Sequence, residues 1–177
     1  RSGRSLTEAI QASAGAGAAF LDYDRDGRLD VYLVNGWRLD GSTVVERGRN
    51  ALYRGLSDGT FRDVTDSAAV GGEGRWGSGV VVTDYDDDGW PDLFVTGFGP
   101  NLLYRNRGDD TFENVAPRLG IEAPGWNTGA AFFDADGDGD LDLYVATYVD
   151  CTLRAVLEAK PTLDWKGLEK VAVGPFG

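Results

Sequence analysis

The nonapeptide DYDRDGRLD at residues 22–30 returns twice along the chain, as DYDDDGWPD at 84–92 and as DADGDGDLD at 134–142. The three copies align without gaps. Each has aspartate at positions 1, 3, 5 and 9 and glycine at position 6. Repetition of this kind is typical of architectures in which one supersecondary unit recurs along the chain. The nonapeptide is therefore the first guide to the fold.

Each nonapeptide lies between two short apolar runs. A glycine and small or apolar residues precede it, and a run of β-branched and aromatic residues follows it. Runs of this length and composition predict strands. We therefore expect a strand–loop–strand unit three times, with the strands at 17–21 and 31–34, 79–83 and 93–96, and 129–133 and 143–146.

A second block follows the first two copies. The motif Asn-x-Leu-Tyr-Arg stands at 50–54 and 101–105, and each copy leads through a turn rich in Gly, Asp, Ser or Asn to Thr-Phe at 60–61 and 111–112. This pattern predicts a β-hairpin. After Asp150 the chain diverges from the repeat, and we expect one short helix near 153–159 that ends before Pro161.

The spacing of the repeats predicts the architecture. The loops begin 62 and 50 residues apart, and most of the difference lies around Trp37 to Arg49, which we interpret as an inserted surface loop. A period of about 50 residues with about four strands is that of a propeller blade. The prediction is an all-β fold, a β-propeller with about three blades in one segment spanning 1–177. Its units are expected at about 6–64, 65–115 and 116–150, followed by a divergent tail at 151–177.

Propellers close with about four to eight blades. Three loops are too few for closure, so we expect a fragment of a larger propeller whose edges are covered by other segments of the same propeller or by a larger assembly.

Composition excludes several classes of function. The 177 residues include no His and one Cys, which rules out Ser-His-Asp and Cys-His nucleophilic sites and zinc bound by histidine. Asp and Glu number 29 against 17 Lys and Arg, a formal charge of −12 that argues against a nucleic-acid partner. No run of 18 apolar residues occurs, so no membrane span is expected.

The acidic nonapeptides indicate calcium. Aspartates at positions 1, 3, 5 and 9, a turn at glycine 6 and a backbone carbonyl at position 7 form an oxygen cage of Ca²⁺ size, whereas Mg²⁺ prefers fewer carboxylates and keeps its waters. About three Ca²⁺ ions are expected. The predicted ligands are Asp22, Asp24, Asp26, Arg28, Asp30, Asp84, Asp86, Asp88, Trp90, Asp92, Asp134, Asp136, Asp138, Asp140 and Asp142, where Arg28, Trp90 and Asp140 would contribute carbonyl oxygens.

The helix-flanked calcium loop is the main alternative to this interpretation. An EF-hand or dockerin loop needs an oxygen ligand at position 12 and a helix after it. Position 12 is Leu33, Val95 or Val145, and all three lie in predicted strands. The strand-flanked loop therefore remains.

These units resemble FG-GAP/VCBS repeats, the blades of the integrin α-subunit propeller. With the added Asn-x-Leu-Tyr-Arg hairpin, they are more specifically similar to the ASPIC/UnbV, or cartilage acidic protein-like, group, over roughly residues 6 to 150. The segment 171–177 is similar to a Cys-Gly-Pro segment of that group, with Val173 in place of the cysteine that would pair with Cys151. The resemblance implies bound Ca²⁺ and a secreted, periplasmic or cell-surface protein.

Aromatic residues outside the loops are candidate ligand contacts. Trp76 and Trp126 stand three residues before the glycines of the second and third units, beside Arg75 and Asn127, and Trp37 and Arg38 lie on the inserted segment. A protein or glycan could stack on such rings. The alternative is that they cap the interface between blades.

The leading hypothesis for function is a non-catalytic protein-interaction, adhesion or assembly scaffold. The second is a carbohydrate-binding or accessory propeller domain of a secreted polysaccharide-acting enzyme. Catalysis is not expected, because nearly every clustered aspartate belongs to a cation loop and no separate acid–base pair is visible. The tripeptide Arg107-Gly108-Asp109 occupies a predicted hairpin turn, and turn chemistry explains it without a receptor.

Overall fold

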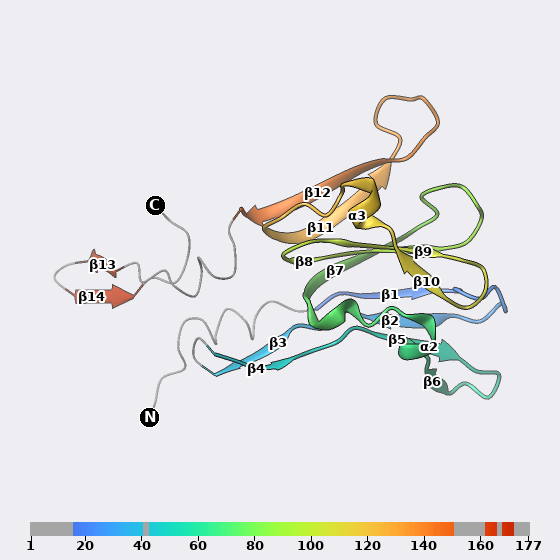
Figure 1. The fold of residues 1–177 in the computed structure, drawn as a ribbon, viewed down its shortest axis with the longest axis horizontal. Coiled ribbons are helices and arrows are strands. Elements are labelled where there is room, and N and C mark those ends of the chain that lie inside the picture. Colours follow the sequence, from blue (N-terminus) through green and yellow to red (C-terminus); the bar gives the residue numbers. More distant parts are fainter. Residues whose placement is uncertain (1–15, 41–42, 151–161, 166–167, 172–177) are drawn as a thin grey trace.

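The computed structural model describes residues 16–40, 43–150, 162–165 and 168–171, and their fold is all-β as predicted (Figure 1). Blade 1 is a four-stranded antiparallel sheet in the order β1 (Ala18–Leu21), β2 (Asp30–Leu33), β5 (Ala51–Gly55) and β6 (Phe61–Asp63). Blade 2 repeats it with β7 (Trp76–Thr83), β8 (Asp92–Phe98), β9 (Leu102–Asn106) and β10 (Phe112–Asn114), and blade 3 begins with β11 (Trp126–Phe133) and β12 (Asp142–Val149). A single pairing of Trp126 with Phe98 joins β11 to β8, so the strands of blades 2 and 3 form one six-stranded sheet. The described strands close no ring.

The core lies between blades, and β8 shows why. Residues 92–97 of this strand are all buried. Leu93 and Val95 join a cluster shared with blade 1, whereas Phe94 joins the cluster shared with blade 3 and packs edge-on against Phe132 at 5.6 Å between ring centroids. Successive side chains of a strand point to opposite faces. A blade in the middle of the stack therefore needs consecutive apolar residues in this strand, here 93–95.

Equivalent glycines bring the first strands of successive blades together. A Cβ placed on Gly17 would lie 2.9 Å from the Cα of Gly79, and one on Gly79 would lie 3.1 Å from the carbonyl oxygen of Thr128. Real Cβ atoms do not fit at the first of these distances. The glycine before each apolar run thus permits backbone-to-backbone packing of neighbouring blades.

The inserted segment differs from its prediction as a surface loop. It forms an antiparallel hairpin, β3 (Trp37–Asp40) and β4 (Thr43–Arg47), with Trp37 opposite Arg47. The β-branched residues at 43–45 favour a strand, and the partner strand lies a few residues away. The hairpin extends from the end of blade 1 opposite the nonapeptide loops (Figure 1).

Single helical turns follow the outermost strands and were not predicted. These are α2 (Thr65–Ala68), α3 (Ala116–Leu119) and the 3₁₀ turn η1 (Gly72–Gly74). The carboxylate of Asp63 accepts the backbone N–H of Thr65 at 2.9 Å, and Asn114 does the same for Ala116 at 3.2 Å. Such side-chain-to-backbone bonds begin a turn. No helix in the described ranges is long and apolar enough to cross a membrane.

The divergent tail contributes one further hairpin, β13 (Thr162–Trp165) and β14 (Leu168–Val171). The helix expected at 153–159, the first residues of the first unit, and the Cys151 and Val173 positions lie outside the described residues. The boundaries of the three repeat units stay predictions.

A buried asparagine anchors each hairpin. The amide nitrogen of Asn50 donates to the hydroxyl of Tyr32 at 3.0 Å, and that hydroxyl donates to the carbonyl of Val70 at 2.9 Å. In blade 2, Phe94 stands in the position of Tyr32. The buried Nδ2 of the equivalent Asn101 has no hydrogen-bond partner among the residues that the structure describes.

This difference predicts opposite effects of two substitutions. Phe94→Tyr should raise the free energy of unfolding by about 1 kcal/mol, because the new hydroxyl can accept from Asn101 and donate to the carbonyl of Ile121, the equivalent of Val70. Tyr32→Phe should lower it by about 1–3 kcal/mol, because it leaves the Asn50 amide unpaired. Urea unfolding at fixed Ca²⁺ concentration measures both, and a destabilising Phe94→Tyr would contradict this account.

Candidate metal centre

The three nonapeptide loops lie at the same end of their blades. Loop 1 connects β1 to β2, loop 2 connects β7 to β8, and loop 3 connects β11 to β12. Figure 1 shows the three loops together at the right of the molecule. Because each loop joins the first two strands of a blade, the repeat places one loop per blade at equivalent positions.

The aspartate at position 1 shapes each loop. In loop 1 the carboxylate of Asp22 accepts the backbone N–H groups of Asp26 and Gly27, both at 3.0 Å. Asp84 and Asp134 make the same pair of bonds in loops 2 and 3. The glycine at position 6 has a φ of 82° to 97° in the three loops, a backbone conformation that disfavours other residues.

The aspartate at position 9 ties the loop to the blade. Asp92 is fully buried, and its carboxylate accepts the N–H of Tyr85 at 3.1 Å and that of Asn106, on β9, at 2.7 Å. Burial raises the pKa of Asp92 to about 6, because these two bonds offset only part of the lost hydration. Asp30 makes the equivalent bonds in blade 1, and burial also raises its pKa.

Three carboxylates converge in each loop, from positions 1, 3 and 9. Within each triplet one oxygen per residue lies within 4.8 Å of the others; the triplets are Asp22, Asp24 and Asp30; Asp84, Asp86 and Asp92; and Asp134, Asp136 and Asp142. We name these triplets 1, 2 and 3. Their separation suits oxygens that share one cation.

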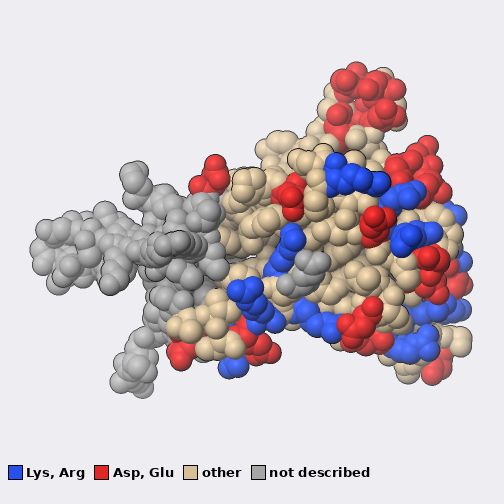
Figure 2. Space-filling model, viewed as in Figure 1, with Lys and Arg blue, Asp and Glu red and all other residues tan. Residues whose placement is uncertain are grey.

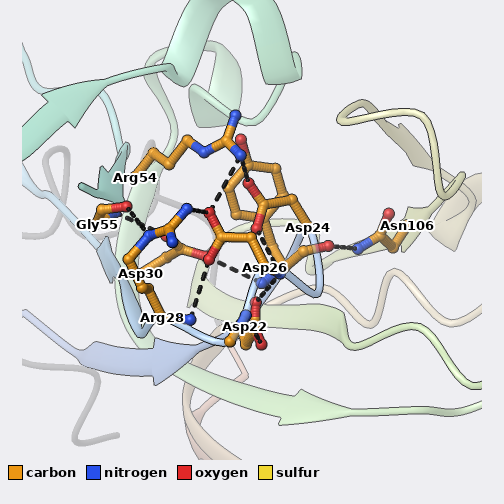
Figure 3. A network of polar contacts seen from close by, with 10 residues as sticks. Asp22, Asp24, Asp26, Arg28, Asp30, Arg54, Gly55 and Asn106 are labelled. Atoms are coloured by element: carbon orange, nitrogen blue, oxygen red, sulfur yellow. Dashed lines mark hydrogen bonds and ion pairs between the residues drawn. The ribbon is translucent and has the colours of Figure 1, made fainter. Parts of the chain in front are cut away.

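The position-5 aspartates stand outside the triplets. One carboxylate oxygen of each accepts the N–H of position 7, as Asp26 does from Arg28 at 3.0 Å and Asp88 from Trp90 at 2.9 Å. Asp138 does the same from Asp140. The second oxygen of Asp26 contacts Arg28 and Arg54 (Figure 3). Direct ligation by position 5 and by the carbonyl of position 7 stays a prediction.

Two arginines that sequence reasoning did not single out complete loops 1 and 2. Arg54 Nη2, from β5, lies 2.5 Å from Asp24 Oδ2 and 3.2 Å from Asp26 Oδ2. Arg105, from β9, contacts Asp86 at 2.5 Å and Asp88 at 2.7 Å. Both are the last residue of the repeated Asn-x-Leu-Tyr-Arg motif, so repetition was the available signal.

Loop 3 has no such arginine among the described residues. Its aspartates are all exposed, and no ion pair reaches them in the described part of the chain. Figure 2 shows the tip of this loop as a red surface without blue beside it, whereas basic side chains lie next to the red ones on the neighbouring loops.

The donor set fits a hard cation such as Ca²⁺. It consists of oxygens alone. In loop 1, Asp24 Oδ2 is buried, with its side chain 2% exposed, and contacts Arg54 without hydrogen-bond geometry. Burial raises the pKa of Asp24, although Arg54 lowers it in part. A buried carboxylate oxygen that has no hydrogen bond is a suitable ligand for a cation.

Aromatic residues gather at the other end of the blades. The ring of Trp76 lies 5.9 Å from that of Trp37 and 6.1 Å from that of Trp126, and Trp126 lies 5.5 Å from Tyr148. Arg47 stacks over Trp37 at 4.8 Å. The structure therefore brings the three predicted tryptophans into one row across three blades.

The polar residues predicted beside them have different surroundings. Arg38 is exposed and pairs with Glu46 at 3.0 Å. Arg75 donates to the carbonyl of Pro100 at 3.2 Å. Asn127 is fully buried, where its amide donates to Asn101 and to the carbonyl of Ala123, so it supports the interface between blades 2 and 3 rather than facing solvent.

The Arg107-Gly108-Asp109 tripeptide lies in the β9–β10 turn. The amide oxygen of Asn106 accepts the N–H of Gly108 at 3.0 Å, and Asp109 accepts the N–H and hydroxyl of Thr111. These bonds are those of a hairpin turn.

Comparison with known proteins agrees with the geometry. The family model of the FG-GAP-like repeat matches residues 39–95 and 84–145. Cartilage acidic protein 1 of Homo sapiens is 32% identical over 136 residues, which are 73% of this chain and 20% of that protein. Cartilage acidic protein 1 of Xenopus tropicalis is 30% identical over 142 residues, 75% of this chain and 20% of that protein.

The chain thus spans about a fifth of the length of these relatives. The resemblance to FG-GAP repeats of the ASPIC-like group is confirmed. With repeated acidic loops, four-stranded antiparallel blades and a family model that matches most of its length, the chain belongs to the FG-GAP-like repeat family.

Proposed function

We propose that this chain is part of a calcium-stabilised, extracytoplasmic β-propeller that acts as a non-catalytic protein-interaction, adhesion or assembly scaffold. The observation that supports it best is the set of three equivalent carboxylate triplets, one per blade, at one end of the sheets. Sites that repeat with the blade and do not converge on a common cleft are those of a structural ion.

Electrostatics gives the ion its role. Three carboxylates within 4.8 Å of one another repel in their charged forms, and a divalent cation turns that repulsion into attraction. Because the triplet exists only when the loop is folded between its two strands, binding stabilises the folded blade. Millimolar Ca²⁺ outside the cytoplasm would fill even weak loops, which favours that location.

Two exposed apolar faces favour a larger propeller. Phe20 and Leu33 lie exposed on blade 1, and Phe133 and Tyr144 lie exposed on blade 3. In blade 2 the counterparts of Phe20, Leu33 and Tyr144 are Val82, Val95 and Phe94, and these pack in clusters shared with neighbouring blades. We propose that further blades of the same propeller cover both faces, in line with the short span of the chain along its relatives.

A second candidate function is a carbohydrate-binding or accessory propeller domain of a secreted polysaccharide-acting enzyme. The row of tryptophans at the end opposite the acidic loops favours it, because indole faces stack on sugar rings.

Calcium should raise the melting temperature of the protein, and EDTA should lower it. At a free Ca²⁺ concentration about 1,000 times the Kd, each filled loop adds about 4 kcal/mol to the free energy of unfolding. Asp136→Asn should remove the contribution of triplet 3. In EDTA this variant should be no less stable than the parent. The side-chain oxygen of Asn can still accept the backbone N–H of Asp138, and the substitution removes one of the charges that repel one another in the loop.

Asp140→Asn is the matched control. It removes one negative charge from the same loop, but the ligand atom predicted at position 7 is the backbone carbonyl, so most of the calcium response should remain. Differential scanning calorimetry with and without EDTA measures both variants. An unchanged melting temperature of the parent in EDTA would refute the proposed role of the ion.

The arginine of loop 2 should compete with the cation. Arg105→Gln is expected to raise the Ca²⁺ affinity of this loop by about fivefold, the effect of removing a positive charge a few ångströms from the site in a high-dielectric setting. The same change should lower stability in EDTA. Terbium luminescence excited through Trp90, at position 7 of loop 2, follows this loop, and displacement by Ca²⁺ gives the affinity. Because Arg25 of loop 1 lies over the same ring at 4.6 Å, the measurement is made in an Asp24→Asn background that weakens loop 1.

Arg107→Gln makes the same charge change at a residue that forms no ion pair with the loop in the described structure. It should alter the affinity much less. A lower affinity in Arg105→Gln would mean that Arg105 positions the carboxylates instead of competing for them.

A further inference from the structure

A cavity of about 340 Å³ lies where the β3–β4 hairpin meets the start of β7. Its wall includes the rings of Trp37 and Trp76, the side chains of Asn35, Arg38 and Glu46, and three glycines. The volume is at the lower end of the range of small-molecule sites. It is far from the acidic loops, because β7 runs from Trp76 at this end to Thr83 at the loop end.

The aromatic part of the wall offers exposed ring surface and one hydrogen-bond donor. The rings of Trp37 and Trp76 are 5.9 Å apart and tilted by 48°, so they form an angled pair instead of a closed stack. The indole N–H of Trp37 donates to the carbonyl of Gly74 at 2.6 Å, which holds this ring in place. The indole N–H of Trp76 has no acceptor within the described ranges, and its nitrogen lies 3.3 Å from where a Cβ of Gly36 would be.

The polar part of the wall can both donate and accept. Arg38 and Glu46 face each other across the hairpin at 3.0 Å, and their side chains are 71% and 63% exposed. The amide of Asn35 is also exposed, and its oxygen accepts the N–H of Gly36 at 2.9 Å. Guanidinium, carboxylate and carboxamide groups at one rim suit neighbouring hydroxyl groups.

The charges argue against an ionic ligand. A cationic side chain would meet Arg38 at the rim, and Arg47 of this chain already covers Trp37 at 4.8 Å. An anionic group would meet Glu46, which pairs with Arg38. A neutral, hydroxyl-rich ligand with an apolar face avoids both conflicts.

The aromatic row gives such a ligand room to extend. From Trp76 the rings continue to Trp126 at 6.1 Å and then to the exposed Tyr148 at 5.5 Å, across blades 2 and 3. A ligand built of several linked rings could therefore contact several of these aromatic side chains at once.

We propose that this cavity binds a neutral pyranose unit of a glycan. The sugar stacks on Trp37 and Trp76 and bonds through its hydroxyls to Arg38, Glu46 and the indole N–H of Trp76, which has no acceptor among the described residues. The adjoining units extend along Trp126 and Tyr148. The inference rests on the second candidate function, a carbohydrate-binding propeller, to which it adds the class of sugar and the residues that bind it.

The test uses the full chain in millimolar Ca²⁺. Isothermal titration calorimetry and tryptophan fluorescence follow the addition of tetrasaccharides of β-1,4-linked glucose, mannose or N-acetylglucosamine, with a galacturonate tetrasaccharide as the acidic comparison. We expect saturable binding of at least one neutral series with a change in fluorescence. The acidic series should bind at least about tenfold more weakly.

Variants locate the site. Trp37→Ala should weaken binding by about tenfold or more, the loss expected for a stacking ring. Arg38→Ala and Glu46→Gln change exposed side chains that folding does not need, and each should weaken binding several-fold. Phe61→Ala, which removes another exposed aromatic ring on the outermost strand of blade 1, is the control and should bind like the parent.

Three results would overturn the inference: no saturable binding of any neutral series, preference for the acidic series, or binding that Arg38→Ala and Glu46→Gln leave unchanged. The melting temperature with and without Ca²⁺ is measured on the same samples. If Ca²⁺ stabilises the protein and no sugar binds, only the ligand inference fails. If Ca²⁺ has no effect on stability, the proposed scaffold role of the ion fails whatever the sugars do.

Discussion

The carboxylate at position 9 of the acidic loop is the contact on which each complete blade depends. In Asp30 and Asp92 one oxygen holds the start of the loop, and the other holds the strand that follows the second one in space. One buried side chain thereby joins the loop, its own strand and the next strand of the sheet, at a point where the backbone ladder alone would leave N–H groups unpaired. Positions 1 and 3 are then held beside it, which crowds negative charge into a small volume.

In the calcium role that we propose, that crowding links the stability of the blades to bound cations. Loops 1 and 2 carry an internal counter-charge in Arg54 and Arg105, whereas loop 3 has none in the described residues. The same repeat therefore presents its carboxylates in two electrostatic settings. The loop at the edge of the described blades is the more exposed one and has the less compensated charge.

The two ends of the blades have different chemistry. Oxygen ligands and ion pairs occupy the end where the first strand turns into the second, and aromatic rings occupy the end where the first strands begin. A rigid sheet separates the two. A ligand bound at the aromatic end, as we propose, would therefore lie apart from the cations that we propose for the loops.

The amino-acid sequence determined the strand–loop–strand repeat, the hairpins and the residues of the triplets, because alternation, turn chemistry and ligand spacing are local properties of the chain. Tertiary structure decided the rest. It turned 37–47 into a hairpin and brought Arg54 and Arg105 to loop aspartates 17 to 30 residues away. It also gathered Trp37, Trp76 and Trp126 from three units into one row. These contacts depend on how blades pack through Gly17 and Gly79, and no local pattern specifies which side chains that packing makes neighbours.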